Sequence, residues 1–77
     1  MFQYMDQIPR RHRGKAYKVQ YHDAISLTWM DIQLRHAGRG AAEMAARTYG
    51  KNKGVPVRLM VIDMDRMERT PEEPLVL

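Results

Sequence analysis

The segment Val55–Asp65 (VPVRLMVIDMD) constrains the fold most, because it is apolar on both sides of a β-strand. Alternate residues of a strand point to opposite faces of the sheet. One face of this strand would carry Val57, Leu59 and Val61, and the other Met60, Ile62 and Met64. A 77-residue chain without cysteine has no disulfide to support a small core. The sequence therefore predicts a strand that is too apolar for either of its two faces to be left open to water.

Two further strands and one helix are expected before it. Residues 15–21 alternate in polarity, with Tyr17, Val19 and Tyr21 on one side, and residues 22–24 form a connector of hairpin length. A second strand runs from residue 25 to residue 34, and its apolar phase slips at Met30 and Asp31, where a β-bulge would restore it. The alternative, a helix from Asp31, would place two glycines inside that helix.

The helix is predicted at Ala41–Tyr49, with Gly38 as N-cap and Gly50 as its C-terminal stop. The order strand, strand, helix, strand predicts one small α+β domain, β-β-α-β. Its three-stranded antiparallel sheet has the order 2-1-3, with the helix on one face. We assign residues 1–14 to a basic arm, 15–65 to this domain and 66–77 to an acidic, proline-containing tail without helix. The other sheet face has no cover except what the two ends of the chain provide.

Positive charge is concentrated in the first part of the chain. Residues 1–53 carry a net charge of +6 and residues 54–77 a net charge of −2. Clustered cations at the start of a strand are typical of surfaces that bind nucleic acid or an acidic protein face. The candidate binding residues are Arg10, Arg11, Arg13, Lys15, Lys18, Arg35 and Arg39. Alternatively, the same cations protect a solvated edge strand from pairing with other sheets.

Two apolar features each have two interpretations. Met60, Ile62 and Met64 form either a protein interface, including that of a homodimer, or a surface packed beneath the terminal segments. Trp29 is interpreted as a core residue that faces the helix together with Tyr17 and Tyr21. The alternative for this aromatic group is a platform on which nucleic-acid bases stack.

Nothing in the sequence indicates an enzyme. The histidines lack the spacing of metal ligands, Asp63 and Asp65 share a strand face without a pocket, and Gly38-Arg39-Gly40 is too short for a phosphate-binding loop. We therefore expect no catalytic residues, no metal and no cofactor. No apolar run reaches the roughly 20 residues of a membrane span, and the N-terminus lacks the apolar stretch of a signal peptide. We expect a cytoplasmic protein without a membrane partner.

The layout of residues 15–65 resembles that of small phage-encoded inhibitors of host machinery, such as anti-CRISPR proteins and inhibitors of host RNA polymerase. The residues that carry the resemblance are 32–37 (IQLRHA), 38–46 (GRGAAEMAA) and 57–62 (VRLMVI). The resemblance implies a non-enzymatic inhibitor in the host cytoplasm that blocks a nucleoprotein complex sterically. It would dock through its basic surface on an acidic protein face or on the bound nucleic acid. Two alternatives are a direct DNA- or RNA-binding protein, which could be dimeric, and an assembly subunit that uses the methionine-rich face.

Overall fold

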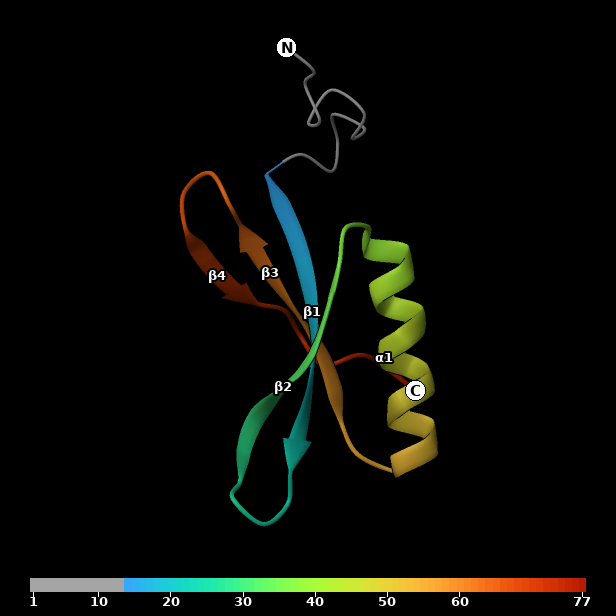
Figure 1. Cartoon of the computed structure of the whole chain (residues 1–77). Helices are drawn as coiled ribbons and strands as arrows, with labels where there is room; N and C mark the ends of the chain where they lie inside the picture. The colour runs from blue at the N-terminus through green and yellow to red at the C-terminus, as the bar shows by residue number, and fades with distance from the viewer. Residues whose placement is uncertain (1–13) are drawn as a thin grey trace.

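The computed structural model describes residues 14–77, which form a four-stranded sheet with one helix packed on it (Figure 1). The predicted cations Arg10, Arg11 and Arg13 lie outside the described residues. The elements are β1 (Lys15–Asp23), β2 (Thr28–His36), α1 (Arg39–Lys53), β3 (Val57–Asp63) and β4 (Glu68–Pro71).

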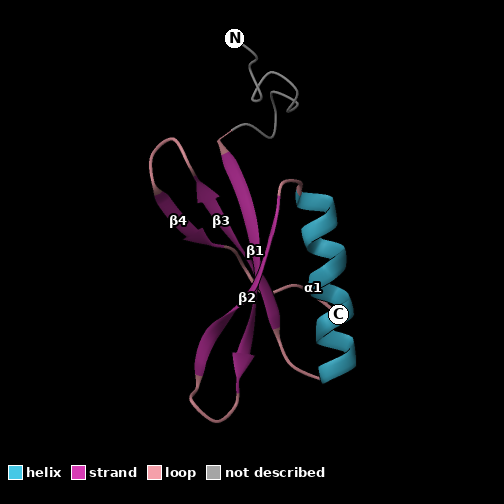
Figure 2. Cartoon of the chain, in the orientation of Figure 1, coloured by secondary structure: helices cyan, strands magenta, loops and turns pink. Residues whose placement is uncertain are grey.

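The sheet has the strand order β2-β1-β3-β4, and every neighbouring pair is antiparallel. Helix α1 lies on one side of it (Figure 2). The α+β class, the antiparallel arrangement and the order of the first three strands are confirmed. The prediction of only three strands was wrong, because residues 68–71 of the tail pair with β3. Asp63 supports this hairpin, since its Oδ1 accepts hydrogen bonds from the backbone N–H groups of Asp65 and Arg66.

The first hairpin also differs from the prediction. β1 continues to Asp23, and the turn occupies residues 24–27, so Ile25 lies in the turn with 94% of its surface exposed. The carboxylate of Asp23 accepts hydrogen bonds from the backbone N–H and the hydroxyl of Ser26, which lowers the pKa of Asp23. Leu27 closes the turn with a left-handed backbone, φ 59°.

The bulge lies further along β2 than predicted. Met30 and Asp31 pair regularly with Tyr21 and Gln20, so the expected bulge at these two residues was wrong. Residues 32–34 instead stand opposite Val19 alone, which puts two extra residues into β2. Because the insertion is an even number, side chains on both sides of it keep the same faces.

Helix α1 is longer at both ends than the predicted Ala41–Tyr49. Gly38 is the N-cap, as expected, but the helix passes through Gly50 and ends at Gly54, whose φ of 66° is left-handed. Gly50 has a different reason to be glycine. A Cβ there would lie 3.1 Å from the carbonyl oxygen of Val55, so the missing side chain lets the helix approach the chain entering β3.

The main core lies between α1 and the sheet. Its buried residues are Val19, Ala42, Ala46, Val57 and Leu59. The tail closes this core, because Leu75 packs against it and the backbone N–H of Leu75 donates to the carbonyl oxygen of Val57. The tail residues after β4 therefore contribute to the helix side of the sheet. The alternative that the C-terminal segment covers Met60, Ile62 and Met64 is therefore wrong for Leu75, which packs on the helix side of the sheet.

Candidate functional site

The sheet face opposite α1 carries the candidate site, and we call it the open sheet face. The strand register and the alternation of side chains assign 13 residues to it. They are Ala16, Lys18, Gln20 and His22 of β1, Trp29, Asp31, Gln33 and Arg35 of β2, Arg58, Met60 and Ile62 of β3, and Arg69 and Pro71 of β4.

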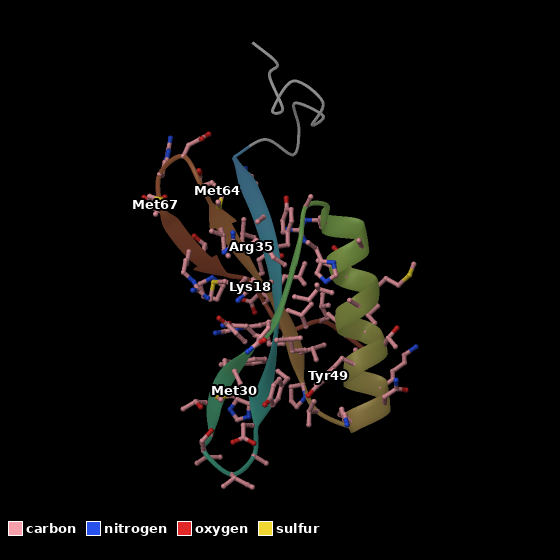
Figure 3. All side chains as sticks on the ribbon, viewed as in Figure 1. Lys18, Met30, Arg35, Tyr49, Met64 and Met67 are labelled. Atoms are coloured by element: carbon pink, nitrogen blue, oxygen red, sulfur yellow. The ribbon has the colours of Figure 1, made fainter. Side chains whose placement is uncertain are left out.

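Four cations from four strands share this face with one carboxylate. Lys18, Arg35, Arg58 and Arg69 lie on the same face as Asp31, so the formal net charge of the face is +3. Figure 3 shows Lys18 and Arg35 on the sheet. Because the face is broad and cationic, it favours anionic ligands over neutral ones.

Asp31 organises the centre of the open sheet face. Its Oδ1 accepts a hydrogen bond from Gln20 Nε2 at 2.6 Å, and its Oδ2 lies 3.0 Å from Arg69 Nη2 and 3.8 Å from Lys18 Nζ. The hydrogen bond from Gln20 and then the pairing with Arg69 and Lys18 lower the pKa of Asp31. Asp31 belongs to edge strand β2 and Arg69 to edge strand β4, so this ion pair joins the two edges across the face.

An aromatic–cation stack adjoins this carboxylate. The guanidinium carbon of Arg58 lies 4.3 Å from the ring centroid of Trp29, and the ring of His22 meets Trp29 edge-on at 5.2 Å. Arg58 Nε also donates a 2.8 Å hydrogen bond to Oε1 of Gln20, which is buried. The assignment of Trp29 to the helix-side core was therefore wrong, whereas Tyr17 and Tyr21 do pack against that core.

The remaining predicted cations are distributed over different surfaces. Lys18 and Arg35 share the open sheet face, and Lys15 is exposed at the start of β1. Arg39 instead lies on the helix side, 5.7 Å from the ring centroid of Tyr17. It is ion-paired with Glu72 and Glu43, and both contacts raise the pKa of Arg39. The structure thus separates Arg39 from Lys18 and Arg35.

The predicted methionine-rich interface is largely covered. Met60 and Ile62 form a small second cluster with Ala16, and each is less than 10% exposed. Met64 lies in the turn before β4 and is half exposed, with its sulfur 4.0 Å from Arg35 Nη1. A ligand on the open sheet face would therefore meet Met64 and the cations before it met Met60 or Ile62.

Sequence reasoning missed Arg58, Arg69, Gln20 and the orientation of Trp29. The position of Arg58 could have been predicted. It alternates with Met60 and Ile62 along the same strand, so it had to lie on the same sheet face as these two residues. The residues around Arg69 show no apolar alternation that would assign it to a face, since its place follows from its pairing in β4. Within residues 14–77, no three histidine, aspartate or glutamate side chains form a group that could hold a metal ion.

α1, the one helix of the described part of the chain, is neither long nor apolar enough to span a bilayer. Comparisons of the chain with protein-family models, with curated proteins and with solved structures find no match.

Proposed function

We propose that this protein is a non-enzymatic binding protein that takes single-stranded nucleic acid on the open sheet face, either free or held in a nucleoprotein complex. The observation that carries the proposal is that Lys18, Arg35, Arg58 and Arg69 share one sheet face without a helix with Trp29, on which Arg58 stacks. Cations track a phosphate backbone, and aromatic side chains and arginine planes stack bases.

The roles of the side chains follow from their partners. Arg35 has no carboxylate partner among residues 14–77, so a phosphate can approach it without breaking an ion pair. Lys18 and Arg69 share the single charge of Asp31 and retain part of their attraction for anions. Trp29 and the guanidinium plane of Arg58 already stack on each other and would extend that stack to a base.

This proposal keeps the inhibitor hypothesis in a narrower form. A protein that binds nucleic acid in a cytoplasmic host complex blocks it by occupying the strand, and no catalytic step is needed. The helix flank contributes less than its sequence implies, because Arg39 is neutralised by Glu43 and Glu72.

The test is fluorescence anisotropy with a labelled 12-nucleotide single strand of mixed sequence, over a salt series. Three to four phosphate contacts predict a slope of log K against log salt of about −2 to −3. Arg35→Gln should weaken binding and reduce this slope by about 0.7. Lys51→Gln, which removes an exposed cation from the last turn of α1, is the matched control and should change neither strongly.

Two results contradict the proposal. One is negligible binding of the single strand at low salt, which would leave an acidic protein face as the remaining ligand. The other is an equal loss with Lys51→Gln and Arg35→Gln, which would mean that net charge alone drives binding and that the open sheet face is not the site.

A further inference from the structure

The two edges of the sheet are protected very differently. β4 has only four residues, all exposed, and carries Pro71; a short strand and a proline both hinder edge-to-edge pairing. β2 has nine residues and no proline. Its charged side chains, Asp31 and Arg35, lie on the open sheet face, and Met30, Ile32 and Leu34 alternate with them on the helix side. Among residues 14–77, no strand pairs with the outer side of β2. A long edge with alternating apolar side chains is suited to pairing with another strand.

The bulge in β2 also favours pairing with another strand. Residues 32–34 carry three sets of backbone N–H and C=O groups opposite the single residue Val19 of β1. The neighbouring strand within the chain therefore cannot pair them all. A strand on the outer side of β2 would provide partners for the remainder.

Apolar surface next to β2 lies on the same side of the sheet as the helix. Met30 and Leu34 are 42% and 64% exposed, and Met44 of α1 is 71% exposed. The residues lining a shallow hollow on this helix flank are Ala41, Met44, Ala45, Thr48, Tyr49 and Asn52. Tyr49 contacts Tyr21, the β1 residue that pairs with Met30, so this flank borders β2. Figure 3 labels Met30 and Tyr49.

We infer that a second copy of this chain covers the β2 edge, with the two β2 strands antiparallel about a two-fold axis at Ile32. This register is self-complementary. It places Met30 opposite the partner's Leu34, Asp31 opposite the partner's Gln33, and Trp29 opposite the partner's Arg35, and each pair occurs twice. Apolar side chains meet on the helix side, while a hydrogen-bonding pair and a cation–π pair form on the open sheet face.

The dimer changes the binding face as well as the edge. Two sheets joined at β2 form one eight-stranded sheet, and the two open sheet faces become continuous. Arg35 of each copy then lies beside Trp29 of the other, so each stacking group is completed by the partner. The dimer itself does not depend on nucleic-acid binding and is tested in its absence.

The first experiment is sedimentation velocity on the full chain without nucleic acid. We expect a species of about twice the 9.0 kDa chain mass at micromolar concentration. Leu34→Glu should convert it to a folded monomer. Leu27→Glu is the matched control, because Leu27 is also exposed but lies in the turn outside the interface, and it should remain dimeric.

The second experiment tests the register and does not require a destabilised variant. The chain contains no cysteine, so Met30→Cys and Leu34→Cys each introduce a single thiol. Oxidation of a mixture of the two variants should give a mixed cross-linked dimer. Either variant alone should cross-link poorly, because identical positions would be four residues, about 13 Å, apart along the strands.

Three results would overturn the inference. They are a monomeric wild-type chain at 100 µM, a dimer that survives Leu34→Glu, and cross-linking of the single variants that equals that of the mixture. If the chain is dimeric and yet binds no single strand, the dimer stands and the proposed function fails.

Discussion

Asp31 is the position where stability and binding should respond in opposite directions. It holds the only negative charge among the 13 residues of the open sheet face, yet it anchors Gln20, Lys18 and Arg69. Asp31→Asn removes the charge and keeps an oxygen that accepts the hydrogen bond from Gln20. The variant therefore separates the electrostatic contribution of Asp31 from its hydrogen bonding.

The expected loss of stability is small. The Asp31→Asn variant would lose two ion pairs between partly exposed groups, each worth about 0.2–1 kcal/mol. A total of about 1 kcal/mol corresponds to a Tm lower by about 4–8 °C for a domain of this size. Asp31→Ala should cost a further 1–3 kcal/mol or so, because the amide of the buried Gln20 then has no acceptor.

Nucleic-acid binding should become tighter in the same Asp31→Asn variant. A carboxylate about 5 Å from a phosphate repels it by about 0.8 kcal/mol in water, and removing that repulsion tightens binding about 2- to 5-fold. Thermal unfolding, monitored by circular dichroism, measures the loss of stability. Fluorescence anisotropy below the Tm measures the change in binding. Glu73→Gln, an exposed charge change elsewhere in the chain, is the control. Weaker binding by a folded Asp31→Asn protein would show that the charge of Asp31 does not repel the bound strand.

Four other perturbations test the fold. Gly40→Ala should stabilise the protein by up to about 1 kcal/mol, since nothing lies near its Cβ, whereas Gly50→Ala should destabilise it through the clash with the Val55 carbonyl, as measured by urea unfolding. Leu27→Gly should raise the Tm, because glycine adopts the left-handed φ at little cost and Leu27 buries little surface; a lower Tm would show that its side chain is packed. The pKa of Asp31 is lowered by folding, so its stabilisation is present above about pH 4 and is lost as the pH falls further; acid unfolding of Asp31→Asn should lack this component.

The sequence predicted the elements better than the side on which residues lie. The alternation in β1 and β3 gave both faces of those strands correctly, because nearly all of their residues belong to the sheet. Ile25 and Leu27 misled the interpretation of β2. They are apolar residues in an exposed turn, and counting them as strand put Trp29 on the helix side. Alternation assigns side chains to the two faces of β2 only from Thr28 onward, where the strand begins.

β4 could not be predicted from apolar alternation, because a short edge strand pairs through its backbone and leaves all its side chains exposed. A weak signal existed in the turns. Each hairpin turn follows an aspartate whose carboxylate accepts hydrogen bonds from the backbone of the turn. Each turn ends at an apolar residue with a left-handed backbone, four positions after that aspartate. These are Asp23 with Leu27, and Asp63 with Met67. The repeated spacing would have indicated a second hairpin.

The partners of the cations were only partly visible in the sequence. Arg39 and Glu43 stand four residues apart on the predicted helix, which is the spacing of an intrahelical ion pair. The second partner, Glu72, requires the tail to return along β3, where its backbone N–H donates to the carbonyl oxygen of Leu59. Long-range placement of this kind follows from the topology and from no local pattern.

Trp29 reports directly on whether the open sheet face binds nucleic acid, because it is the only tryptophan in the chain. Its intrinsic fluorescence should be quenched when a short single-stranded oligonucleotide is added at low salt. The quenching should reverse as salt is raised and should be strongly reduced in Arg58→Gln. Unchanged Trp29 fluorescence at oligonucleotide concentrations that saturate binding would contradict the account, because the strand would then lie away from the open sheet face.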